Sequence, residues 1–123
     1  MLARAGITPS DKRAVGIILA GLKPLSKLRV SLPLPYALVF LSVAAEEGKP
    51  MATYGRELGF TRYNISRYVR CIGDQGRGGT AGLGLVTSTR SKSYPRLNVF
   101  LTAKGRALAK QVFENLRQTS AEP

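Results

Sequence analysis

Two glycines four residues apart, Gly55 and Gly59, constrain the fold of this 123-residue chain more than any other feature of its sequence. A helix-turn-helix needs a small residue midway along its first helix, where the second helix crosses closely, and a turn residue that tolerates positive φ. Apolar and aromatic residues occupy the positions that pack around such a crossing: Tyr54, Leu58, Phe60, Ile65 and Tyr68. This joint match predicts a helix-turn-helix over about residues 51–74.

The second helix of this unit, expected over about residues 61–74, separates into an apolar and a cationic side. At about 100° per residue, one arc holds Thr61, Ile65, Tyr68, Val69 and Ile72. The opposite arc holds Arg62, Tyr63, Ser66, Arg67 and Arg70. Solvated helix faces usually mix both signs of charge, whereas this one carries three arginines and no acid. Contact with DNA is therefore the favoured interpretation, and an ordinary solvated face is the alternative.

The polar residues of this helix are candidate DNA contacts with different roles. Arg62 and Arg67 have the forked donor geometry that reads guanine in the major groove. Arg70 lies farther from the helix N-terminus, which favours a phosphate. Smaller polar side chains and Tyr63 are candidates for base edges or phosphates. The full candidate set is Thr61, Arg62, Tyr63, Asn64, Ser66, Arg67 and Arg70.

Helical spacing, together with the capping residues, prolines and glycines that begin or end helices, predicts the positions of the remaining elements. Thr8 and Pro9 are typical of a helix start, and Pro24 should kink or end that helix. Pro35 should begin a helix that is apolar nearly all round and therefore buried. The glycine-rich stretch 76–84 predicts a flexible connector, and the tail after Arg117 should fray. The expected elements are helices over about 9–28, 35–47, 51–58 and 103–117, and strands over 85–89 and 97–101.

The two expected strands enclose a basic turn, RSKSYPR, so they predict a hairpin with a cationic tip. Beside a helix-turn-helix, such a hairpin is able to enter or flank a minor groove. The alternative is an ordinary strand edge protected by lysine and arginine. The candidate contacts in this hairpin are Arg90, Ser91, Lys92, Ser93, Tyr94 and Arg96.

The charge balance agrees with a polyanionic partner. The chain has 19 Lys and Arg against 7 Asp and Glu, a net charge of +12. DNA, RNA and an anionic membrane surface are all compatible with that excess, and so is a basic protein without such a partner. The apolar stretch Ala14–Leu22 is too short to span a bilayer and lacks a following cleavage site, so we expect a cytoplasmic protein.

The composition gives little support for an enzyme or for a metal-binding protein. One cysteine and no histidine give no intrachain disulfide, no spacing of metal ligands and no histidine general base. We therefore expect neither an enzyme nor a bound metal or cofactor. Cys71 is interpreted as a half-buried inert residue, with a redox switch as the alternative. Glu46 and Glu47 point in different directions on a helix, so we expect them to pair with nearby basic residues rather than form a catalytic dyad.

A resemblance extends over about residues 35–116, and three segments within this range carry it: GRELGFTRYNISRYVRCI, GLVTSTRSKSYPRLNVFLT and TAKGRALAKQV. Together they resemble the MarR family of winged-helix transcription regulators, in which "GL" opens the first wing strand and an "LT-x-KGR" motif joins the second strand to the final helix. The resemblance implies a homodimer that binds near-palindromic double-stranded DNA and represses transcription. It also implies that the N- and C-terminal helices form the dimer interface, with Val15, Ile18, Leu19, Leu22, Leu108, Val112 and Leu116 as candidates. Periodicity alone would make these residues ordinary core.

These observations lead to one expectation of fold and function. The fold class is α+β, mainly α: one winged helix-turn-helix domain over 1–123, with a two-stranded β-hairpin wing at about 85–101 and flanking dimerisation helices at about 9–28 and 103–117. The expected function is a dimeric repressor that occludes promoters. The alternatives are a plasmid or phage replication or partition protein, an RNA-binding basic protein, and an interaction module without DNA binding. The operator and any small-molecule effector stay open.

Overall fold

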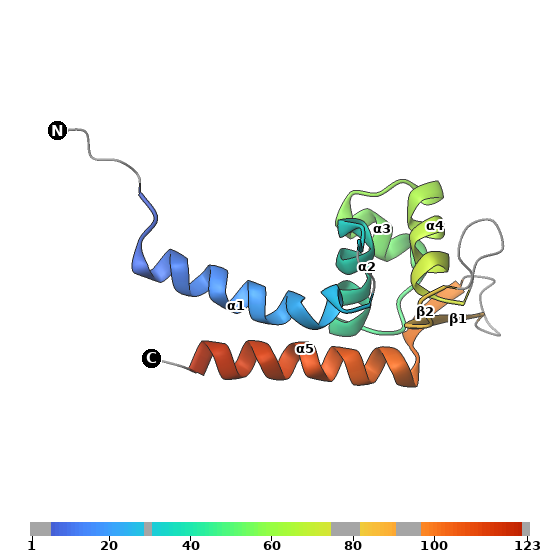
Figure 1. Ribbon diagram of the computed structural model, residues 1–123. Helices are drawn as coiled ribbons and strands as arrows, with labels where there is room; N and C mark the ends of the chain where they lie inside the picture. Colours follow the sequence, from blue (N-terminus) through green and yellow to red (C-terminus); the bar gives the residue numbers. More distant parts are fainter. Residues whose placement is uncertain (1–5, 29–30, 75–81, 91–96, 122–123) are drawn as a thin grey trace.

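The computed structural model describes residues 6–28, 31–74, 82–90 and 97–121, with only the backbone of Arg90. Its elements are α1 (Pro9–Ser26), α2 (Leu34–Ala45), α3 (Met51–Leu58), α4 (Arg62–Ile72), β1 (Val86–Arg90), β2 (Leu97–Leu101) and α5 (Ala103–Ala121). Figure 1 shows α1 and α5 side by side, while α2, α3, α4 and the hairpin gather at one end of that pair. This arrangement is a winged helix-turn-helix, so the predicted fold class is confirmed. Within the described ranges, no helix is both long and apolar enough to cross a membrane.

The hydrophobic core forms around α2. Val39, Phe40 and Val43 of this helix are fully buried, and α3, α4, β2 and α5 all pack against it. The prediction that the helix from Pro35 is buried is wrong at Leu38, which is exposed because these elements leave one side of α2 uncovered; Leu34, where α2 begins one residue earlier than expected, is exposed as well. The other elements contribute these buried residues to the core: Leu25, Tyr54, Ile65, Val69, Ile72, Leu85, Val86, Val99, Leu101, Ala109 and Val112.

The antiparallel packing of α1 on α5 explains why α1 does not end at Pro24 and why α5 is longer than expected. A proline has no backbone N–H, so Pro24 leaves the carbonyl of Ala20 without its helical donor. The side-chain amide of Asn115 in α5 donates to this carbonyl at 3.2 Å, and α1 continues past Pro24 to Ser26. Near the other end of the pair, the Arg13 guanidinium donates to the carbonyl of Ser120. The predicted fraying after Arg117 is therefore wrong for residues 118–121, which continue α5.

The hairpin pairs in antiparallel register, with Val86 opposite Leu101 and Arg90 opposite Leu97. The segment before α3 extends this sheet by a short stretch: the N–H of Gly48 donates to the Val99 carbonyl at 2.8 Å, and the Val99 N–H donates to the Lys49 carbonyl at 3.1 Å. Gly48 has φ of 87°, a left-handed conformation that glycine adopts without strain. The strand β2 is thus held between β1 and the entrance to α3.

Glu46 and Glu47 pair with basic residues, as expected. Glu46 forms an ion pair with Lys49, which also binds Glu57 at 2.9 Å. The carboxylate of Glu47 accepts two bonds from the Arg106 guanidinium, at 2.8 and 2.9 Å, and a third from the Leu101 N–H at 2.9 Å. Glu47 therefore joins the end of α2 to the end of β2 and the first turns of α5.

This cluster predicts a pH dependence of stability. The bonds from Arg106, and next the Leu101 N–H, hold the pKa of the Glu47 carboxyl below its usual range. A depressed folded-state pKa stabilises the fold above the unfolded pKa, and this stabilisation is lost as pH falls through the folded value. We expect the melting temperature of the wild type to fall in acid, and Glu47→Gln to show a shallower fall below about pH 4.5. Thermal unfolding at several pH values checks this, and parallel curves for the two proteins would contradict it.

Candidate nucleic-acid interface

The turn between α3 and α4 has the geometry that the two glycines predict. A Cβ on Gly55 would lie 3.0 Å from Ile65 Cγ2 and 3.1 Å from Ile65 Cβ, so α3 and α4 do cross closely at this point. Gly59 ends α3 with φ of 79°, and the Phe60 N–H donates back to the Gly55 carbonyl at 2.8 Å. The turn therefore fixes the direction in which α4 leaves α3.

Thr61 caps α4, as predicted. Its hydroxyl oxygen accepts a bond from the Asn64 N–H at 3.1 Å, which satisfies one of the unpaired donors at the helix N-terminus. The assignment of Thr61 to the core side of the helix is wrong, because the residue precedes the first turn and is exposed.

Removal of this cap should weaken α4. We expect Thr61→Ala to lower the free energy of unfolding by about 1 kcal/mol, because the Asn64 N–H loses its acceptor. Thr61→Ser keeps the acceptor and should stay near the wild type. Urea unfolding followed by circular dichroism checks both variants, and equal losses for serine and alanine would assign the effect to the methyl group instead.

The remaining residues of α4 divide into the two predicted sides. Ile65, Val69 and Ile72 are buried with 2%, 3% and 0% exposure, and Tyr68 is half-buried against the core. The polar candidates lie away from the core: Arg62, Tyr63 and Arg70 are exposed, and Asn64, Ser66 and Arg67 are half-buried. The packed side therefore holds the helix while the polar side faces outward.

The polar side of α4 is cationic, because its arginines have no acidic partner among the described residues. Within the part of the chain that the structure describes, no ion pair or hydrogen bond engages the guanidinium of Arg62, Arg67 or Arg70. Three nearby glutamates bind other basic residues: Glu46 and Glu57 contact Lys49, and Glu47 contacts Arg106. Three uncompensated guanidiniums on one helix are suited to binding phosphates and guanine edges.

Aromatic contacts around Arg67 were not anticipated from the sequence. The Cζ atom of Arg67 lies 5.9 Å from the ring centroid of Tyr63 and 5.3 Å from that of Tyr68. The i, i+4 spacing of Tyr63 and Arg67 was a signal for the first contact. The second depends on how Phe60 and Tyr36 pack on Tyr68.

The C-terminus of α4 is tied to the start of the hairpin by backbone hydrogen bonds. The N–H groups of Leu83 and Leu85 donate to the carbonyls of Cys71 and Ile72 at 3.1 and 2.7 Å. Gly84 likewise donates to Gly73 at 2.8 Å. These bonds satisfy carbonyls that have no partner inside the helix, and they set the hairpin at a defined position beside α4. Residues 76–81 of the predicted connector lie outside the described residues.

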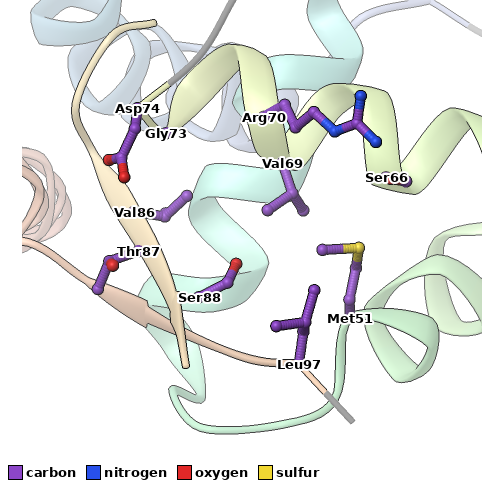
Figure 2. Close-up of a pocket in the computed structure, with 10 residues that line it drawn as sticks. All are labelled: Met51, Ser66, Val69, Arg70, Gly73, Asp74, Val86, Thr87, Ser88 and Leu97. Carbon is purple, nitrogen blue, oxygen red and sulfur yellow. The ribbon is translucent and has the colours of Figure 1, made fainter. Parts of the chain in front are cut away.

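A groove of about 230 Å³ lies between α4 and the hairpin (Figure 2). In this view Val69, Met51 and Leu97 point into the groove, while the Arg70 side chain runs along α4 toward Ser66. Two candidate DNA contacts, Arg70 and Ser66, therefore line this groove. The tip candidates Ser91, Lys92, Ser93, Tyr94 and Arg96, and the side chain of Arg90, lie outside the described residues.

The segment Thr102–Arg106 closes the base of the hairpin. The Thr102 hydroxyl donates to the Gly84 carbonyl at 2.6 Å and accepts from the Gly105 N–H at 3.0 Å. Lys104 Nζ donates to the Leu83 carbonyl at 2.9 Å. The LT-x-KGR motif therefore holds the hairpin to α5, and its Arg106 binds Glu47 rather than forming part of the cationic face of α4.

The candidates for a dimer interface occupy different environments. Val15, Ile18 and Leu19 are 52%, 56% and 59% exposed on α1. Leu22, Leu108 and Leu116 are half-buried against the core, and Val112 is fully buried within the chain. Leu116 packs on Gly21, where a Cβ would come within 2.6 Å of Leu116 Cδ2. Cys71 is half-buried, and its thiol is free rather than part of a disulfide.

A helix-turn-helix with one cationic helix, followed by a hairpin tied to that helix, defines the winged-helix class of protein. No protein-family model and no curated protein sequence matches the chain. Solved structures do match it, and they include MarR-family proteins. A MarR-family transcriptional regulator from Silicibacter pomeroyi shares 18% identity and a TM-score of 0.58 over 98% of this chain and 78% of that one. The chain therefore has the winged-helix fold seen in MarR-family regulators.

Two further matches have bound molecules. The PcaV transcriptional regulator from Streptomyces coelicolor, in complex with its natural ligand, shares 19% identity and a TM-score of 0.57 over 97% of this chain and 81% of that one. The transcriptional repressor CouR, bound to a 23-mer DNA duplex, shares 22% identity and a TM-score of 0.58 over 91% of this chain and 75% of that one. At these identities the likeness establishes the fold.

Proposed function

We propose that this chain is a MarR-like transcription regulator that binds double-stranded DNA with sequence preference. The observation that carries the proposal is the outer face of α4, where Arg62, Arg67 and Arg70 have no acidic partner within the described residues. The core contacts of Ile65, Val69 and Ile72 fix this helix from behind, so its cationic side is free to enter a major groove. A similar fold is bound to DNA in the repressor CouR, which supports the proposal.

The contacts divide by chemistry. Arg62 and Arg67 lie toward the N-terminus of α4 and read base edges, while Arg70 near its C-terminus binds a phosphate. Thr61, Asn64 and Ser66 supply further contacts to bases or backbone. The hairpin tip approaches the adjacent minor groove through its basic residues.

The regulator acts as a homodimeric repressor by promoter occlusion. Val15, Ile18 and Leu19 form an exposed apolar stripe on α1, which a second copy would cover. Leu22, Leu108 and Leu116 are half-buried and would adjoin this interface, while Val112 is buried within the protomer. Two protomers would place two copies of α4 on half-sites about 34 Å apart, one helical turn of DNA, and so exclude RNA polymerase from the promoter.

Selection of bound duplexes from a random pool at physiological salt tests this function. We expect a near-palindromic consensus whose half-sites are about 10 base pairs apart. The affinity for that consensus should fall steeply with added salt, because each neutralised phosphate releases counterions. Equal affinity for structured RNA, no consensus, or an affinity insensitive to salt would contradict the proposal.

A further inference from the structure

The guanidinium of Arg67 lies close to two tyrosine rings, those of Tyr63 and Tyr68, and its donor groups have no partner in the described part of the chain. Both ring centroids are within 6 Å of its guanidinium carbon, which is the range of a cation–π contact. The ring of Tyr68 is itself fixed, because Phe60 packs edge-on against it at 5.1 Å and Tyr36 lies 5.8 Å away. Arg67 thus contacts a ring whose position is fixed by its aromatic neighbours.

The second ring that Arg67 contacts, that of Tyr63, is exposed. Tyr63 is 67% exposed and makes no contribution to the hydrophobic core. Long side chains of a helix point back toward its N-terminus, so Arg67 extends toward Tyr63, which lies one turn earlier. Cation–π contacts use the face of the guanidinium and leave its N–H edge free to donate. Neither Arg62 nor Arg70 has such a contact within the described ranges.

The geometry points to Tyr63 as a positioning residue for Arg67, which it holds with Tyr68 in a conformation ready to donate to guanine. The inference rests on the proposed function, and it assigns Arg67 rather than Arg62 as the main source of base preference. A long side chain loses rotamer freedom when it binds, and ordering it beforehand reduces that loss. Tyr63 acts through Arg67 and makes no base contact of its own.

Four variants on the duplex selected by the wild type test this role: Tyr63→Ala, Tyr63→Phe, Arg67→Ala and the double variant Tyr63→Ala/Arg67→Ala. We expect Tyr63→Ala to weaken binding about two- to fivefold and to flatten the preference at the same base pair as Arg67→Ala. Tyr63→Phe keeps the ring and should match the wild type. In the Arg67→Ala background, Tyr63→Ala should cost nothing further. Equal losses for phenylalanine and alanine, or fully additive losses, would overturn the inference.

A measurement without DNA separates the inference from the proposed function. In the free wild type, NMR relaxation of the Arg67 Nε–H group should show an ordered side chain, and Tyr63→Ala should make it mobile. A mobile Arg67 in the wild type would overturn the positioning role while the DNA-binding function stands. An ordered Arg67 whose replacement weakens binding uniformly across sequences would overturn base reading by Arg67, and with it the inference.

Discussion

Combined replacement of Arg62, Arg67 and Arg70 by alanine is expected to reduce affinity for the selected duplex by at least about a thousandfold at physiological salt. Each bidentate base contact contributes about 1–3 kcal/mol, and each lost phosphate contact also reduces the salt dependence, with a slope change of about 0.9. All three side chains lie outside the core, so the melting temperature should change little. Fluorescence anisotropy over a salt series measures both the affinity and the slope.

A second triple variant controls for net charge. Lys23, Lys110 and Arg117 are exposed on α1 and α5, and their replacement by alanine removes the same amount of positive charge. Because charges farther than about 8 Å from the DNA are screened at physiological salt, this variant should retain most of the affinity. If the two triple variants lost the same affinity, the chain would bind DNA through its overall charge and not through a specific interface on α4.

Gly105→Ala is expected to destabilise the fold by about 2–4 kcal/mol. A Cβ at this position would lie 2.0 Å from the Leu85 carbonyl oxygen and 2.9 Å from its carbon. Both are backbone atoms that cannot rotate away, and Leu85 is also bonded to Ile72 and Thr102. The first turn of α5 or the base of the hairpin must therefore move. Helix propensity alone predicts the opposite sign, a gain of about 1 kcal/mol.

Gly16→Ala provides the matched control. Gly16 is also helical, but a Cβ there would meet nothing within 4 Å. This variant should gain about 0.5–1 kcal/mol, because alanine loses less backbone entropy when the helix forms. Chemical denaturation of the two variants measures the change in the free energy of unfolding, and its sign, for each of them. Stabilisation by Gly105→Ala would show that α5 does not approach Leu85 as closely as the structure describes.

Much of the candidate site was predictable because its determinants are local. The close crossing at Gly55, the positive φ at Gly59 and the cap at Thr61 each follow from a few neighbouring residues. Helical periodicity placed Ile65 and Val69 toward the core. The contacts of the hairpin tip and the assembly of two chains stay predictions.

Other features depend on residues distant in sequence. Pro24 is accommodated within α1 because Asn115 reaches the Ala20 carbonyl, a contact that no local pattern indicates. Val15 and Val112 have the same apolar character and helical spacing, yet one is exposed and the other buried. Val112 lies on the side of α5 that packs on neighbouring elements, whereas Val15 lies on a side of α1 that no described element covers. Periodicity identifies an apolar face but not what covers it.

The amino-acid sequence alone determined that this chain forms a helix-turn-helix with a cationic outer face, because glycine conformations, helix caps and side-chain spacing act over a few residues. Tertiary structure decided which charges stay uncompensated and which side chains are held in place. Glu47 binds Arg106 across the fold, and Tyr36 packs on Tyr68 beside Arg67. Such pairings join residues far apart in the chain, and only the packing of helices and strands brings them within reach.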